Sequence, residues 1–160
     1  MAELYLITGA LLMSAALVLA FGYSAAGAVA AYAGAWALRM SGYSSVNPRL
    51  LLFWAIAVLM VVSINMASGS RPAIPIRARC FIVGGAIAGM AAGLAFYQAG
   101  ATLGATAGCL LGGVAHMGLN RMRDNRLVGR WLVAVGLPAV VTVSLVAMGI
   151  QGILLRSAGL

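Results

Sequence analysis

The sequence predicts an all-α fold, a polytopic bundle of transmembrane helices. Of its 160 residues, 64% are hydrophobic and only 8% are charged, and the mean hydropathy is +1.07. A soluble domain is about half apolar and about a quarter charged, so this chain has too few polar residues to cover a water-soluble surface. Its long apolar runs are the second observation, because a helix needs about 20 apolar residues to cross a bilayer.

Four apolar stretches, separated by short segments that contain arginine, define the expected helices. They occupy residues 4–38, 50–66, 80–117 and 131–155. The first and third have 35 and 38 residues. As single helices they would be about 50 Å long or more, against a hydrocarbon core of about 30 Å. Each of these two stretches is therefore predicted to be a helical hairpin.

Glycine and polar residues mark the expected turns of the two hairpins, at 22–24 and at 98–100. The prediction is thus a single transmembrane domain over residues 1–160 with six spans. Five spans is the alternative count, because the second span is short. The six spans are about 4–21, 24–38, 50–66, 80–97, 101–117 and 131–155.

The arginines predict the orientation of the bundle. All ten basic residues are arginine, and the acids are Glu3 and Asp124. With six spans, loops 67–79 and 118–130 share a side and carry seven of the ten arginines. Because cytoplasmic loops are enriched in Lys and Arg, we expect these two loops in the cytoplasm, both termini outside, and a location in a bacterial inner membrane. Five spans would move the N-terminus inside.

A weak internal similarity raises the possibility of a repeat. The tripeptide at 19–21 recurs at 94–96, and Trp-Ala-Ile-Ala-Val at 54–58 resembles Trp-Leu-Val-Ala-Val at 131–135. Three spans is an odd number, so the second copy would be inverted relative to the first, as in many secondary transporters. The alternative is chance similarity in a sequence rich in alanine and glycine.

Glycine recurs at every fourth position in two of the predicted spans. The residues are Gly85, Gly89 and Gly93 in the fourth span, and Gly100, Gly104, Gly108 and Gly112 in the fifth. Helices in lipid associate by close backbone approach, which small residues at this interval allow. We therefore predict that these glycines are helix-packing residues of a glycine zipper. A sliding seam or an oligomer contact is the alternative.

Four polar residues within the spans are candidates for a functional role. His116 is the sole histidine and lies near the end of the fifth span, while Thr102 and Thr106 share one face of that span. Asn65 lies near the end of the third. Intramembrane histidine can change its charge near neutral pH. The alternative for all four is hydrogen bonding at the interface or between helices.

A basic segment follows the fifth span. Its arginines are Arg121, Arg123, Arg126 and Arg130. We expect them to contact anionic lipid headgroups or an acidic partner. The net charge of +8 would suggest nucleic acid in a soluble protein, but in a membrane protein the lipid surface is the expected partner, and nucleic acid is not.

No motif in the sequence marks a catalytic site. There are no paired carboxylates and no phosphate-binding loop, and although geometry does not exclude a Ser-His-acid set, nothing in the local sequence marks a nucleophile. The two acids are far apart in the chain, and Cys80 and Cys109 lack the spacing of metal ligands. We therefore expect no enzyme activity, no metal and no cofactor.

Two functions remain. The first is an integral membrane subunit or assembly factor that packs through its glycine-rich helix faces against the helices of a larger membrane complex. The second is a small transporter or permeation module for a neutral or anionic solute, working as a homo-oligomer. The small loops and the lack of charge inside the spans favour the first.

Overall fold

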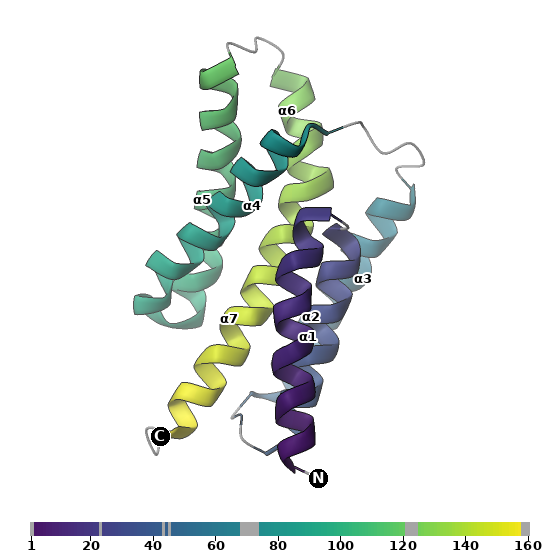
Figure 1. The fold of residues 1–160 in the computed structure, drawn as a ribbon, viewed down its shortest axis with the longest axis vertical. Helices are drawn as coiled ribbons and strands as arrows, with labels where there is room; N and C mark the ends of the chain where they lie inside the picture. Colours follow the sequence, from purple (N-terminus) through teal and green to yellow (C-terminus); the bar gives the residue numbers. More distant parts are fainter. Residues whose placement is uncertain are drawn as a thin grey trace.

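Helices that run alternately up and down the long axis make up most of the molecule (Figure 1). The structure is a computed structural model, and it describes residues 2–22, 24–42, 44, 46–67, 74–120 and 125–157. These residues contain no strand, so the predicted all-helical fold class is confirmed for the described part of the chain.

The two long apolar stretches each form a helical hairpin, as their lengths predict. In the first, α1 (Ala2–Gly22) is followed by α2 (Ser24–Met40). In the second, α4 (Ile76–Gly93) leads through a 3-10 turn, η1 (Leu94–Phe96), into α5 (Tyr97–Asn120). The two hairpins point in opposite directions along the long axis (Figure 1).

The remaining helices are α3 and a long C-terminal rod. Helix α3 (Pro48–Ala67) connects the hairpins. The rod consists of α6 (Asn125–Trp131), a π-helical turn η2 (Leu132–Gly136) and α7 (Leu137–Ser157). It runs between the two hairpins, and its end lies at the same end of the molecule as the start of α1 (Figure 1).

Five helical segments are long and apolar enough to cross a membrane, and the chain is therefore an integral membrane protein. They are Ala2–Gly22, Pro48–Ala67, Ile76–Phe96, Ala99–Leu119 and Arg126–Ser157. Helix α2 has 17 residues and is not among them. The prediction that the chain is an integral membrane protein is thus confirmed.

Helix α7 is the central helix of the bundle. In the most apolar window of its segment 72% of the residues are buried, against 22% in each of the other four. One side of α7, with Val143, packs on a cluster that includes Ile82 of α4. The other side, with Leu145, packs on a cluster that includes Leu38 of α2 and Leu51 of α3.

The connection between α2 and α3 is fixed by local signals. Gly42 has a φ of 73°, the left-handed conformation that glycine adopts most easily after a helix. Asn47 caps α3, because its Oδ1 accepts a hydrogen bond from the backbone N–H of Arg49 at 3.0 Å. Pro48 occupies the first helical position, where a missing N–H costs nothing.

The turn expected at 98–100 lies elsewhere. The chain bends at η1, residues 94–96, and residues 98–100 are already part of α5. Gly100 serves close packing instead of a turn, since a Cβ there would lie 2.5 Å from the carbonyl oxygen of Gly93. The turn position predicted at 98–100 was therefore wrong, whereas this contact agrees with the helix-packing position predicted for the same glycine.

Both predicted cytoplasmic loops are shorter than expected within the described residues. Helix α4 begins at Ile76, inside the predicted loop 67–79, with Pro75 as its N-cap residue. Proline is compatible with a helix start because no intrahelical bond needs its N–H there. Likewise, α5 extends to Asn120 and α6 begins at Asn125.

The long C-terminal helix changes its hydrogen bonding just before Pro138. The N–H of Leu137 donates to the carbonyl oxygen of Leu132, an i to i−5 bond. Pro138 cannot donate an N–H, and a π turn is one way to accommodate such an interruption. Thr142 Oγ1 then donates to the Pro138 carbonyl oxygen at 2.8 Å. The helix therefore continues through the proline.

Candidate helix-docking groove

Helices α4 and α5 meet backbone to backbone along their glycines. A Cβ placed on Gly89 would overlap the carbonyl oxygen of Gly104, and a Cβ on Gly104 would overlap that of Gly89. The same reciprocal relation holds for the pairs Gly85 with Gly108 and Gly93 with Gly100, and Gly112 meets the carbonyl of Phe81. The structure therefore brings all seven predicted glycines into one contact inside the chain.

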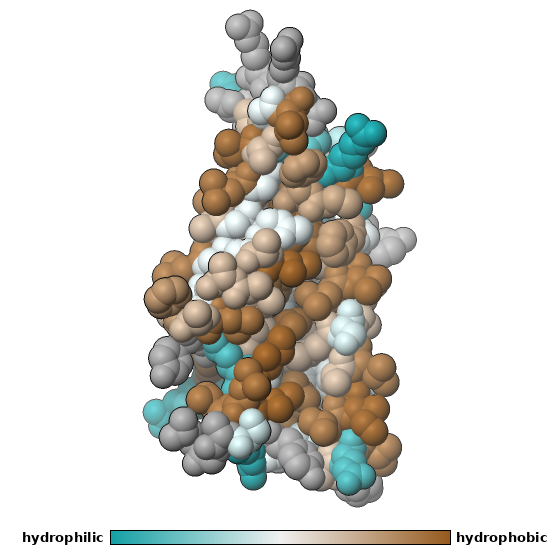
Figure 2. Space-filling view, turned by 60° about the vertical axis from the view of Figure 1, so that its left-hand side comes forward, coloured by the Kyte–Doolittle hydropathy of each residue, from teal (hydrophilic) through white to brown (hydrophobic). Residues whose placement is uncertain are grey.

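The outer side of this helix pair is an open apolar groove of about 1100 Å³. Its walls carry small side chains, chiefly Gly84, Ala88 and Ala92 of α4 and Ala107 of α5, with Leu103 and Leu111 as a ridge. Figure 2 shows this side of the molecule, where a pale band crosses the brown surface. Nothing lies within 4 Å of a Cβ placed on Gly84, so the groove has room for a partner.

Aromatic residues pack at one end of the groove. Phe81 lines the groove, and its ring centroid lies 5.6 Å from that of His116. The His116 ring lies 5.9 Å from the ring of Trp131 at the end of α6. His116 is only 5% exposed, so it is an interior residue at the junction of α4, α5 and α6.

The four polar candidates do not form one site. Thr102 and Thr106 are half-buried on α5, and Thr106 Oγ1 donates to the carbonyl oxygen of Leu103 at 2.7 Å. His116 follows Thr106 by ten residues, a distance of about 15 Å along the helix. Asn65 is half-buried on α3. A continuous polar path through these residues has no support in their positions.

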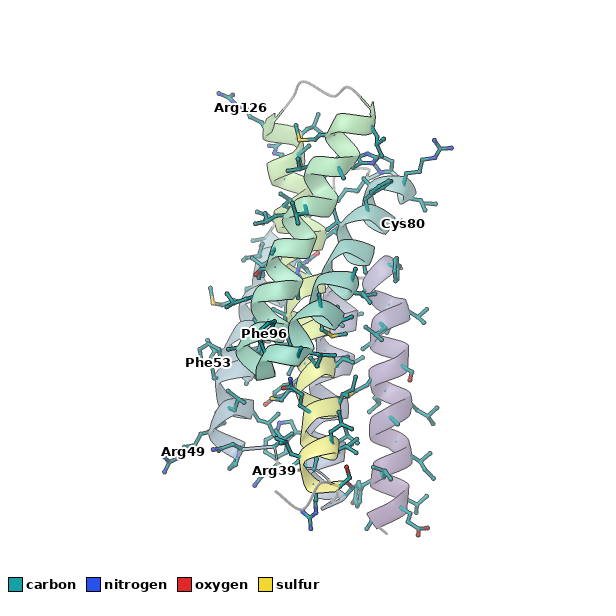
Figure 3. The ribbon with its side chains drawn as sticks, turned by 90° about the vertical axis from the view of Figure 1, so that its left-hand side faces the viewer. Arg39, Arg49, Phe53, Cys80, Phe96 and Arg126 are labelled. Carbon is teal, nitrogen blue, oxygen red and sulfur yellow. The ribbon has the colours of Figure 1, made fainter. Side chains whose placement is uncertain are left out.

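The described arginines gather at the two ends of the molecule. Arg77 and Arg79 begin α4, and Arg126 and Arg130 are exposed on α6, whereas Arg39, Arg49 and Arg156 lie on the ends of α2, α3 and α7. Figure 3 shows Arg126 at the opposite end of the bundle from Arg39 and Arg49. The predicted contact residues Arg121 and Arg123 lie outside the described residues.

Two arginines bind backbone carbonyls. Arg79 Nη1 donates to the carbonyl oxygen of Gly22 at 3.0 Å, which links the start of α4 to the end of α1. Arg39 Nη1 donates to the carbonyl oxygen of Val46 at 2.6 Å. A cation at a helix C-terminus satisfies a free carbonyl and opposes the helix dipole, so Arg79 stabilises the end of the first hairpin.

The outward-facing set of small residues on α4 was not predicted from the sequence. Gly84, Ala88 and Ala92 recur at every fourth position, and each directly precedes a glycine of the packed seam in the sequence. The signal was present in the sequence. Helix α4 has two neighbouring stripes of small residues. Which stripe faces inward and which faces outward cannot be decided until the position of α5 is known.

Comparison with protein-family models, with curated proteins and with solved structures found no match to this chain.

Proposed function

We propose that this protein is a subunit or assembly factor of a larger membrane complex, and that it receives a transmembrane helix of another protein in the α4–α5 groove. The open groove of small residues carries this proposal. Other outward faces are different. On α3, for example, Leu52, Phe53 and Ile56 are each more than 60% exposed, which is the bulky surface that lipid chains solvate well.

Membrane physics favours a helix in such a groove. Lipid tails are as apolar as leucine, so helices associate through close van der Waals packing rather than through a hydrophobic driving force. Walls of glycine and alanine let a second backbone approach closely, and they lose almost no side-chain entropy when they are covered. The groove therefore offers a partner helix more contact than any bulky face does.

A transport role has less support. Thr142, buried in the central helix, donates to the carbonyl oxygen of Pro138. Ser41 likewise donates to the carbonyl oxygen of Leu38. Hydroxyl groups that bind their own helix in this way offer little to a solute.

For the membrane topology we propose six crossings, with α2 as the short one. Its 17 residues correspond to about 25 Å, close to the thickness of the hydrocarbon core. The opposite directions of the two hairpins (Figure 1) agree with an inverted arrangement of two three-helix units, and α4 and α6 carry the arginine-rich end that we assign to the cytoplasm. A reporter fused to the N-terminus tests this topology, because a cytoplasmic signal would exclude six crossings with the arginine-rich end in the cytoplasm.

The docking function is tested by filling the groove without touching the glycine seam. Ala88 is exposed in the groove, and Ala15 is an exposed alanine of α1 outside it. We expect the wild-type protein and Ala15→Leu, extracted in mild detergent, to migrate with other membrane proteins, and Ala88→Leu to migrate alone. A wild-type chain that purifies as a monomer or homo-oligomer and moves solute across liposomes would contradict the proposal and favour the transporter.

A further inference from the structure

An exposed arginine, Arg77, lies at one mouth of the α4–α5 groove, about one helical turn before Cys80 and Phe81, the first residues that line it. Arg77 precedes Gly84 by seven residues, which is close to two helical turns and places both on the same face of α4. Cys80 and Phe81, one turn further along, line the groove at this end. Figure 3 shows Cys80 and Phe96 toward opposite ends of α4 and the following turn.

The Arg77 side chain is available to a partner. It is exposed, and among the residues that the structure describes no hydrogen bond or ion pair holds it. Arg126 and Arg130 are exposed on α6 at the same end of the bundle. Of the two acids in the sequence, Glu3 lies in the first turn of α1, at the opposite end, and Asp124 is outside the described residues.

This charge distribution selects among the possible occupants of the groove. A second copy of the chain in the same orientation would bring its own Arg77 to the same mouth, and like charges across an interface suppress association. An occupant with a negative group at this end gains attraction instead. The positions 84, 88 and 92 form holes at every fourth residue, which matches the side-chain spacing of a helix. A lipid chain has no such spacing.

We propose that the occupant is a transmembrane helix with bulky apolar side chains at every fourth position and an acidic side chain at the end that lies beside Arg77. This inference rests on the proposed docking function and adds the chemistry of the partner. The apolar part gives contact with Gly84, Ala88 and Ala92, and the acidic group fixes the direction and the depth of insertion. Without the acid, the same helix could slide along the smooth walls.

The test uses two synthetic transmembrane peptides in phosphatidylcholine vesicles that contain the full-length protein. Each peptide has about 20 leucine and alanine residues, enough to cross the bilayer, and one cysteine beside its flanking residue. That flanking residue is Glu in one peptide and Gln in the other. Binding is read as disulfide cross-linking to Cys80 after addition of copper phenanthroline, which with dissolved oxygen takes up the two electrons that the two thiols lose. Cys80 is exposed at the groove mouth, whereas Cys109 is buried.

We expect the Glu peptide to cross-link about fivefold more than the Gln peptide, which corresponds to about 1 kcal/mol. Arg77→Gln should reduce this ratio to about one, and Arg77→Lys should preserve most of it, since these changes affect only the charge that we assign to the mouth. Arg49→Gln, at the other end of the bundle, is the matched control and should leave the ratio unchanged. Ala88→Leu should lower cross-linking of both peptides.

The possible failures are distinguishable. Equal cross-linking of both peptides that Ala88→Leu abolishes would retain the docking function and overturn the acidic partner. If neither peptide cross-links, the docking function itself fails. A Cys80–Cys80 product between two copies would identify the chain itself as the occupant. Loss of cross-linking on adding phosphatidylglycerol would identify an anionic lipid as the occupant. Either of the last two results overturns the inference.

Discussion

The α carbon of Gly89 faces the backbone carbonyl of Gly104, and the relation is reciprocal, so that neither position has room for a β carbon. This contact lies in the middle of the α4–α5 seam. It joins two helices that follow each other in the chain, so that the seam is completed within a single molecule. The same seam glycines also line the groove on the outside of the pair, together with the outward-facing small residues Gly84, Ala88 and Ala92.

A substitution at a seam glycine should therefore destabilise the protein far more than a substitution at an outward-facing position of the same helix. We expect Gly89→Ala to lower the stability by about 1–3 kcal/mol or more, because the added carbon overlaps backbone atoms that cannot move aside. Gly84→Ala, with no atom within 4 Å of the new carbon, should be neutral or stabilising by up to about 1 kcal/mol. Unfolding by sodium dodecyl sulfate in mixed micelles measures both. Equal losses for the two variants would mean that α4 and α5 do not meet as the structure describes.

The cap of α3 gives a second prediction. Asn47→Ala should lower stability by about 0.5–2 kcal/mol, because the N–H of Arg49 loses its acceptor. Asn47→Asp should keep most of the stability, since the carboxylate can accept the same bond. Hydrogen exchange at the start of α3 provides the local measurement. Unchanged exchange in Asn47→Ala would show that the cap is not used.

The link between the first hairpin and α4 depends on Arg79. Arg79→Gln removes the hydrogen bond to the Gly22 carbonyl, and we expect a loss of about 1 kcal/mol or less because the site is partly solvated. Arg156→Gln at the opposite end is the control and should have no effect. Thermal unfolding in detergent compares the two. A larger effect of Arg156→Gln would contradict this role for Arg79.

The two cysteines should differ in reactivity. Cys80 is exposed and Cys109 is buried, so a membrane-permeant maleimide should add once to the folded protein. Cys80→Ser should abolish this addition, and Cys109→Ala should not. Intact mass measured before and after unfolding is the readout. Two additions to the folded chain would show that the interior around Cys109 is open.

Most of the helices could be predicted from the lengths of the apolar stretches. A run of 35 or 38 residues is too long for one crossing, and the structure divides each such run into two helices, as predicted. The ends of the helices were less accurate. Pro75 looked like a barrier to helix formation, but it precedes the first helical residue, where proline is tolerated. Sequence patterns give the type of an element more securely than its boundary.

The glycines show what sequence could not provide for the site. Their four-residue spacing identified the seven positions, but not which helix each would face. That information depends on how α4 and α5 are rotated about their own axes. The rotation is set only when the two helices pack against each other. His116 is similar, because its ring contacts come from Phe81 and Trp131, 35 and 15 residues away in the chain.

The π-helical turn at Leu132–Gly136 holds one residue more than an α-helical turn of the same rise would. Removing a single residue there would restore i to i−4 bonding except at Pro138, which donates no N–H, and would leave the segments before and after it in phase. Elsewhere in α7, where residues 141–149 are all buried, a one-residue deletion rotates all later side chains by about 100°. The turn is thus the position in this buried helix where evolution or an engineer could shorten the chain without repacking the core.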